Sequence, residues 1–171
     1  MPESSQSLCH EKTFSDVFNE YAKTLFNYLY YQCGDEAQAE DLTQDAFLKL
    51  WQNCSEVKLS TAKGYVFKIA KNKMLNSFEH QKVKLKFQRR VPKDRTDESP
   101  EFLLEHKEFS VQLEAAISEL SEKQRVAFLL SRIDKKTYKE IAEILGISKQ
   151  AVEKRIYNAL DSLRKVNKNI K

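Results

Sequence analysis

The sequence contains few of the residues that interrupt helices. Its 171 residues include only three glycines and three prolines, while 32% of them are charged. Long helices joined by few tight turns are typical of such a composition. Stretches in which apolar and polar residues alternate, as half-buried strands require, are scarce. The composition therefore predicts an all-α protein.

Two kinds of apolar segment are also missing. No apolar run approaches the roughly 20 residues that cross a bilayer as a helix. The first twelve residues, MPESSQSLCHEK, contain no basic segment followed by an apolar core, which a secretory signal would have. We therefore expect neither a membrane protein nor a secreted one, and a cytoplasmic location. Residues 1–12 are expected to be disordered.

Cysteine and histidine are too sparse to indicate a reactive centre. Cys9, Cys33 and Cys54 are odd in number and unclustered, which favours unpaired thiols in a reducing cytosol over a disulfide framework. No Cys or His residues lie at metal-ligand spacing, and neither a glycine-rich phosphate loop nor a nucleophile–base pair occurs. We expect no metal, no cofactor and no enzymatic activity.

Charge is distributed along the chain in blocks. The formal net charge is +4, but residues 13–60 carry −5 and residues 94–122 carry −7. The basic blocks are residues 61–93, with +9, and residues 123–171, with +8. Two basic blocks that coincide with amphipathic helices indicate two separate contacts with a polyanion. Ordinary solvated surface is the alternative.

Apolar residues at helical spacing predict a helix over residues 13–31, which Gly34 ends. Its inward positions are Phe14, Phe18, Tyr21, Leu25 and Leu29. Asp35, with Gln38 three residues later, is typical of a helix N-cap. A second helix is therefore expected over residues 36–52. Its inward positions are Ala39, Leu42, Ala46 and Leu50.

The second helix also carries an acidic stripe that lies off its inward line. The stripe consists of Asp41, Gln44, Asp45, Leu48 and Trp51. Aromatic anchors often dominate protein interfaces, so the stripe predicts a docking face for another protein. In the alternative, Trp51 completes the core and the carboxylates are only solvated.

A third helix is expected from Ser60 or Thr61 to about Phe87. Its apolar positions include Tyr65, Val66, Ile69, Ala70 and Leu75. Its other face carries lysine and asparagine, at Lys68, Lys71, Asn72 and Asn76. Such a face suits contact with a nucleic-acid backbone and with unstacked bases.

Residues 88–100, QRRVPKDRTDESP, have the composition of a linker, with two prolines, many charges and almost no apolar side chains. We therefore expect two small helical domains, residues 13–87 and residues 101–171, joined by a flexible acidic linker.

Residues Thr137–Leu163 place two short amphipathic helices around a Gly-Ile-Ser turn. Gly146 can take the left-handed conformation that ends a helix, and the Ser148 hydroxyl can cap the next one. The pattern predicts a helix-turn-helix, whose second helix reaches base edges and phosphates in a major groove. Its outward residues are Lys149, Gln150, Glu153, Lys154, Tyr157 and Asn158. A helical hairpin with a solvated polar face is the alternative.

Three segments together resemble the short extracytoplasmic-function group of the sigma-70 family of RNA polymerase sigma factors. AEDLTQDAFLKLW, residues 39–51, is similar to the family's polymerase-binding helix. GYVFKIAKNKMLNSF, residues 64–78, resembles the helix that melts and reads the −10 promoter element. Residues 117–165 resemble the domain that reads the −35 element. The resemblance implies a sigma factor with region 2 at residues 13–87 and region 4 at residues 101–171.

The resemblance also implies partners and roles. The acidic stripe matches the surface that docks on the clamp coiled coil of the largest polymerase subunit, and region 4 is expected to meet the polymerase flap. Asn72 falls where family members hold a flipped −10 base, and residues 55–60 resemble the segment beside that pocket. The outward residues of the helix-turn-helix match the −35 readers, although Glu153 replaces what is often a basic residue. Members are usually held inactive by an anti-sigma factor, so such a partner is implied.

A conventional helix-turn-helix regulator is the alternative function. Its N-terminal half would sense a ligand or form a dimer, and it would act without being a polymerase subunit. The basic helix argues against this alternative, because a sensing domain needs no second cationic surface.

Overall fold

The computed structural model of the chain describes residues 7–77 and 100–166, and for residues 100–106 it describes the backbone alone. The expected end of the third helix at residues 78–87 and residues 88–99 of the expected linker lie outside the described residues. So do residues 1–6 and 167–171.

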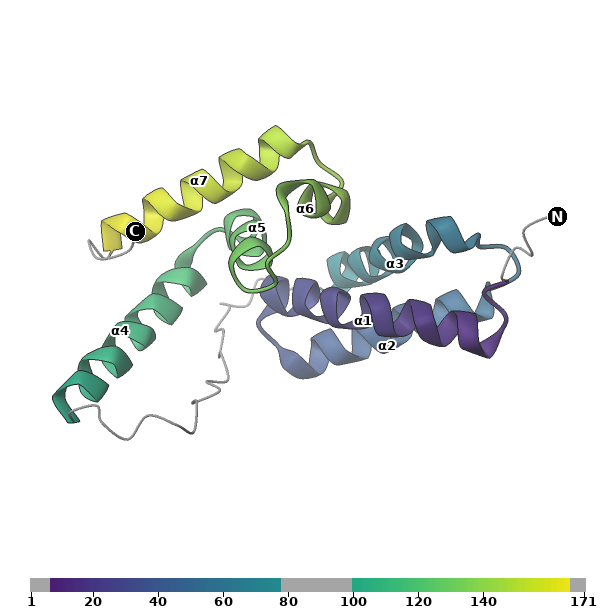
Figure 1. Cartoon of the computed structure of the whole chain (residues 1–171), viewed down its shortest axis with the longest axis horizontal. Coiled ribbons are helices and arrows are strands. Elements are labelled where there is room, and N and C mark those ends of the chain that lie inside the picture. Colours follow the sequence, from purple (N-terminus) through teal and green to yellow (C-terminus); the bar gives the residue numbers. More distant parts are fainter. Residues whose placement is uncertain (1–6, 78–99, 167–171) are drawn as a thin grey trace.

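Every element within the described residues is a helix, which confirms the prediction of an all-α protein (Figure 1). In chain order the elements are α1 (Glu11–Cys33), α2 (Glu36–Gln52), the 3₁₀ turn η1 (Leu59–Thr61), α3 (Ala62–Ser77), α4 (Pro100–Glu119), α5 (Glu122–Arg132), α6 (Tyr138–Leu145) and α7 (Lys149–Val166). None of these helices is both long enough and apolar enough to cross a membrane. Five of the acidic residues of the block at 94–122 lie on α4.

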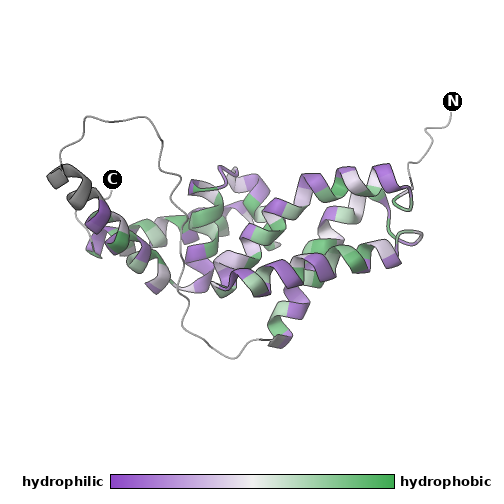
Figure 2. Ribbon diagram, turned by 90° about the horizontal axis from the view of Figure 1, so that it is seen from below, coloured by the Kyte–Doolittle hydropathy of each residue, from purple (hydrophilic) through white to green (hydrophobic). Residues whose placement is uncertain are grey.

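Helices α1, α2 and α3 pack against one another as the first helical group (Figure 1). The turn between α1 and α2 forms as predicted: Gly34 has a φ of 69°, and the Asp35 carboxylate accepts a hydrogen bond from the Gln38 backbone N–H at 3.0 Å. Their apolar faces meet inside the group, where burial of apolar surface stabilises the fold (Figure 2). The buried residues include Leu25, Leu29, Ala46, Leu50, Val66 and Ala70.

Two residues predicted to lie in this core are exposed instead. Phe18 is 40% exposed, although its ring packs edge-on against Phe47 with centroids 4.8 Å apart. Leu75 is 66% exposed, because its neighbour Met74 continues the inward line of the helix four residues after Ala70. Adjacent residues of a helix point about 100° apart, so both cannot face the core.

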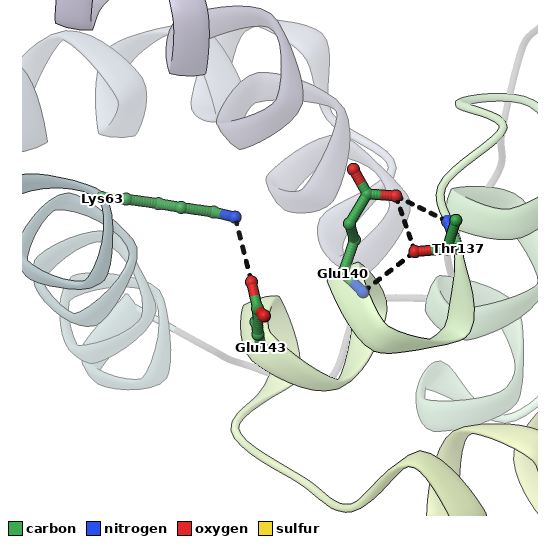
Figure 3. A network of polar contacts seen from close by, with 4 residues as sticks. All are labelled: Lys63, Thr137, Glu140 and Glu143. Carbon is green, nitrogen blue, oxygen red and sulfur yellow. Dashed lines mark hydrogen bonds and ion pairs between the residues drawn. The ribbon is translucent and has the colours of Figure 1, made fainter.

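Helices α4 to α7 form the second helical group, in which α7 packs against α4, α5 and α6. The predicted caps form: Ser121 Oγ accepts from the Gln124 N–H at 3.4 Å, and Gly146 ends α6 with a φ of 65°. A capping box that the sequence analysis did not identify begins α6. The Glu140 carboxylate accepts from the Thr137 N–H at 2.7 Å, and this hydrogen bond lowers the pKa of Glu140 (Figure 3).

The two groups meet where α5 packs on the end of α1, a contact that the sequence analysis did not predict. Its centre is Arg125, which is only 4% exposed. The guanidinium donates to the carbonyl oxygens of Tyr31 at 2.8 Å and Gln32 at 3.2 Å on α1. It also donates to the carbonyl oxygens of Leu120 at 3.0 Å and Ser118 at 3.4 Å in its own group. One side chain thus satisfies acceptors on both sides of the contact.

Further polar contacts join the two helical groups. Asp134 Oδ1 accepts from Asn27 Nδ2 at 2.7 Å and from the Tyr31 hydroxyl at 3.3 Å. At the α6 side, Lys63 Nζ of α3 lies 3.6 Å from Glu143 Oε2 (Figure 3). This ion pair is exposed, so it adds little stability by itself. Arg125 and Asp134 thus supply the more buried polar contacts between the groups.

The expectation that all three cysteines are unpaired is wrong for two of them. Cys9 and Cys54, 45 residues apart, form a disulfide with their Cα atoms 5.1 Å apart. The reason is that α1 and α2 run in opposite directions, which returns the connection after α2, with Cys54, to the start of α1. Residues 7–12 are correspondingly ordered rather than disordered: Leu8 is buried and α1 begins at Glu11. Cys33 is the free cysteine among the described residues.

We predict that Arg125→Ala lowers the free energy of unfolding by about 2–4 kcal/mol, because it leaves several buried carbonyl groups without donors. Urea unfolding of the full chain measures this loss. Arg125→Lys is expected to restore little of it, since an ammonium cannot reach acceptors on both sides in the fork geometry of a guanidinium. The exposed Arg132 of the same helix supplies the control, Arg132→Ala. A loss below about 1 kcal/mol for Arg125→Ala would contradict the assignment.

We also predict that the contact weakens as the pH rises. Burial raises the pKa of Asp134 above its ordinary value of 3.8, although hydrogen bonds from Asn27 and Tyr31 oppose the shift. The folded carboxyl therefore holds its proton more tightly than the unfolded one. Its contribution to stability is complete below pH 3.8 and is lost as the pH rises through the raised pKa.

The Asp134→Asn variant checks this, because it keeps the acceptor oxygen and removes the charge. The free energy of unfolding of Asp134→Asn minus that of wild type should increase from pH 4 to pH 7. Urea unfolding of both proteins at each pH measures this difference. Asp161→Asn, which removes an exposed carboxylate paired with Lys165, is the control. A constant difference between wild type and Asp134→Asn across this range would refute the prediction.

Candidate nucleic-acid interface

Helix α3 presents the predicted lysine and asparagine residues to solvent. Their side chains are exposed because Val66, Ala70 and Met74 direct the opposite side of the helix into the core. The exposed Leu75 lies among them, between the two asparagines. We call this surface the α3 face, and its residues are Lys68, Lys71, Asn72, Leu75 and Asn76. Ammonium and amide groups beside an apolar side chain suit contact with phosphates and unstacked bases.

A cleft of about 530 Å³ lies at the beginning of α3. Its lining comes from the connection between α2 and α3 and from the first turns of α3, and it includes Asn53, Val57, Ser60, Gly64, Tyr65 and Lys68. Asn53 Nδ2 donates to the Tyr65 hydroxyl at 3.0 Å and holds the two walls together. The segment that resembles the family's base pocket, residues 55–60, thus borders a real cleft. Lys68 belongs both to this cleft and to the α3 face.

Helix α7 exposes the predicted −35 residues on one side. Lys149, Gln150, Glu153, Lys154 and Tyr157 are exposed, and Asn158 is half-buried. The helix is held by its opposite side, on which the buried residues are Val152, Ile156, Ala159 and Leu163.

Its start is fixed by the predicted cap, in which Ser148 Oγ accepts from the Ala151 N–H at 3.1 Å. The turn before it is fixed by Gly146. The outward residues are therefore presented on a rigid element, as a helix that reads DNA requires.

Helix α2 exposes the whole acidic stripe, with Leu48 at 56% and Trp51 at 42%. The Trp51 ring packs edge-on against Phe14 with centroids 5.0 Å apart, so one side of it is supported and the other is open. This geometry suits an aromatic anchor, because little side-chain freedom remains to be lost on binding.

The acidic stripe is also connected to α3. Lys73 Nζ lies 2.6 Å from Asp45 Oδ2, so one carboxylate of the stripe is already paired within the chain. Both side chains are about half exposed, and the pair is therefore exchangeable for a pair with another protein.

Sequence reasoning missed Leu75 and Lys73 at these surfaces. The sequence did indicate that Leu75 is exposed. Val66, Ala70 and Met74, at four-residue spacing, form the buried side of the helix, and residue 75 does not lie on that side. Lys73 had no local signal, because its partner Asp45 is brought near by tertiary packing.

No metal centre accompanies these surfaces in the part of the chain that the structure describes. Residues 7–77 and 100–166 contain no group of three or more His, Cys, Asp and Glu side chains that could hold a metal ion. The expected absence of a metal and of a cofactor stays a prediction for the chain as a whole.

Comparison with known proteins finds two regions of one family in this chain. The family described as sigma-70 region 2 matches residues 17–83, and the family described as sigma-70 region 4 matches residues 110–163. Together the two matches cover more than half of the chain. The first contains the acidic stripe and the α3 face, and the second contains the helix-turn-helix.

Two relatives are similar over most of the chain. The ECF RNA polymerase sigma factor SigE of Mycolicibacterium smegmatis is 25% identical over 157 residues, which cover 89% of this chain and 60% of that protein. The ferric citrate uptake sigma factor FecI of Escherichia coli is 28% identical over 152 residues, or 87% of each protein.

A solved structure shares the fold. The sigma factor RpoE of Bartonella quintana, crystallised in complex with the anti-sigma factor NepR, superposes with a TM-score of 0.61. The sequence identity is 18%, and the match covers 94% of this chain and 99% of that one.

Proposed function

The chain belongs to the extracytoplasmic-function group of the sigma-70 family, and from that membership we propose that it binds core RNA polymerase and directs transcription initiation at specific promoters. One observation supports this function best: a single chain exposes two separate cationic helical faces, on α3 and on α7. The mechanism involves no covalent chemistry and works in the cytoplasm. Residues 13–87 act as region 2, residues 88–100 as the linker and residues 101–171 as region 4.

Docking on the polymerase uses the acidic stripe of α2. Leu48 and Trp51 supply the apolar anchors, and the carboxylates of Asp41 and Asp45 select a basic partner surface. The clamp coiled coil of the largest subunit is the proposed partner, with the flap as a second contact for region 4. An anti-sigma factor would keep the protein from the polymerase until its signal arrives.

The −35 element is read by α7 in the major groove. Lys149 and Gln150 lie at the start of the helix, where phosphate contacts set register, and Lys154, Tyr157 and Asn158 reach toward the bases. Glu153 can accept a hydrogen bond from a cytosine amino group. It thereby selects against base pairs that place an acceptor at that position.

The −10 element is captured by α3 and the adjoining cleft. Extruding a base costs a few kcal/mol, so the protein must offset this cost with a fitted site for each extruded base. Asn72 and Asn76 offer amide groups to base edges, Leu75 offers apolar contact, and Lys68 and Lys71 attract the phosphates. Strand opening becomes favourable only where the extruded bases match these groups.

Reading both elements at once requires the two helical groups to separate. The Lys63–Glu143 ion pair, at 3.6 Å, joins the start of α3 to α6. A path that follows α3, this ion pair, α6 and the turn to α7 sets an upper limit on how far apart the two DNA-reading helices lie. The limit is roughly 45 Å from Asn72 to Lys149 and roughly 60 Å from Asn72 to Asn158. Elements named −10 and −35 lie about 25 base pairs apart, which is about 85 Å of straight duplex. We therefore propose that the contact centred on Arg125 opens when the polymerase complex engages its promoter.

We predict that the full chain with core polymerase supports run-off transcription from its promoters, which start-site mapping after overexpression would identify. The chain alone should bind the same promoter duplexes weakly, since its two faces are held too close together to bind both elements. The conventional regulator makes the opposite prediction. Tight binding to promoter duplex without polymerase, together with no run-off product, would reject the sigma-factor function.

We predict that Asn72→Ala lowers run-off transcription about tenfold, because loss of one hydrogen-bonded base contact costs on the order of 1–3 kcal/mol. Its affinity for core polymerase should be unchanged, since Asn72 lies outside the acidic stripe. The control is Asn19→Ala on α1, an exposed asparagine whose side chain donates to Ser15 Oγ, four residues earlier on the same helix. Undiminished transcription by the Asn72 variant would remove this residue from base capture.

A further inference from the structure

Cys9 and Cys54 form a disulfide beside the start of α1, and Figure 1 shows that α5 packs near the other end of this helix. Cys9 lies two residues before α1, and Cys54 lies two residues after α2. Their Cα atoms are 5.1 Å apart, and the structure joins their sulfurs. Cys9 is exposed and Cys54 is half-buried, so small thiols and disulfides have access to the bond.

Each cysteine is anchored to its own surroundings. On one side, the buried Leu8 and a hydrogen bond from the His10 N–H to the Ser7 carbonyl at 3.0 Å hold the residues around Cys9. On the other side, the Cys54 N–H donates to the Trp51 carbonyl at 3.2 Å. The disulfide therefore links a fixed point at the start of α1 to the beginning of the connection between α2 and α3.

That connection forms a wall of the cleft beside α3. Asn53, directly before Cys54, lines the cleft and bonds Tyr65. Glu56 and Val57, just after it, also line the cleft, and their N–H groups donate to the Asn53 carbonyl at 3.0 and 3.1 Å. A disulfide that restrains Cys54 therefore also restrains the residues of the connection that line the cleft.

We propose that Cys9 and Cys54 form a redox-responsive clasp that controls how firmly the cleft captures unpaired −10 bases. The clasp deepens the proposed function and rests on it. In the oxidised protein the wall is held in its binding geometry, so less order has to be created on binding and affinity is higher. In the reduced protein the connection keeps only its hydrogen bonds and the packing of Val57 against the core, and the cleft binds bases less tightly.

The oxidant is a low-molecular-weight disulfide such as oxidised glutathione. The thiolate of Cys9 attacks it, one small thiolate leaves, and a mixed disulfide forms. The Cys54 thiolate then displaces the second small thiolate and forms the protein disulfide. Two protein thiols lose two protons and two electrons in total, and the small disulfide becomes two thiols.

The third cysteine does not take part and supplies a control. Cys33 lies at the opposite end of α1, where its thiol bonds the Asp35 carbonyl at 3.3 Å. Burial raises the pKa of the Cys33 thiol, which leaves less of the reactive thiolate.

Hydrogen exchange of the full chain tests the clasp without DNA. Samples are equilibrated in reduced and oxidised glutathione, and mass spectrometry identifies the bond between peptides that contain Cys9 and Cys54. The amides of Glu56 and Val57 should exchange at least threefold faster in the reduced protein. Wild type and Cys33→Ser should respond in this way, whereas Cys9→Ser and Cys54→Ser should show the faster exchange in both buffers.

Promoter binding tests the functional consequence. The polymerase complex is titrated with a promoter DNA in which the −10 region of the non-template strand is left unpaired. Reduction should weaken binding at least threefold for wild type and Cys33→Ser and should leave Cys9→Ser and Cys54→Ser unchanged. Equal exchange and equal affinity in both redox states would overturn the clasp.

A different pattern would reject the proposed function instead. If no such DNA binds in either state, the promoter-reading function fails, and the clasp is then decided by amide exchange alone. If exchange responds to oxidation while a functional complex binds DNA equally in both states, the proposed control of base capture is overturned.

Discussion

The arrangement of this molecule depends on one guanidinium. Arg125 is buried between α1 and α5, and its hydrogen bonds go to backbone carbonyl oxygens on both helical groups. Desolvation lowers the pKa of Arg125, so the charged group is stable there only while its acceptors are in place. A partly opened contact would keep the charge buried and lose its partners, whereas full separation returns the charge to water. The contact is therefore expected to be either closed or open, with few states between.

The contact centred on Arg125 sets the distance between the two DNA-reading helices, and it does not cover their surfaces. The acidic stripe of α2, the α3 face and the outward side of α7 are all exposed while the two helical groups are packed together. Nothing in the described part of the chain covers the surfaces that the proposed function uses. What the closed form fixes is the separation of α3 from α7, and that separation is too short for two distant promoter elements. A partner that favours the closed form would thus oppose promoter binding without touching a DNA-reading residue.

Local features of this fold could be predicted from the sequence, whereas contacts between distant parts of the chain could not. The difference has a physical reason. The bounds of α2, the Asp35 cap, the Gly146 turn and the Ser148 cap follow from residues within a few positions of one another. The disulfide and the contact between the helical groups depend on where whole helices lie in space. Arg125 did carry a signal, since it precedes the buried Leu129 by four residues. The same pattern is typical of an arginine whose stem is covered while its head reaches water, so sequence alone could not separate the two.

Helix α1 carries the disulfide near one of its ends and the Arg125 contact at the other, and its length separates the two. The disulfide lies beside its first turn, and the carbonyl oxygens of Tyr31 and Gln32 that bind Arg125 lie in its last turn. A helix of 23 residues is about 35 Å long, well beyond the roughly 7–10 Å over which separate changes usually interact. Oxidation at one end should therefore alter the cleft while leaving the hydrogen bonds of Arg125, at the other end, unchanged. Each step of promoter engagement, separation of the helical groups and capture of bases, would then be adjustable independently of the other.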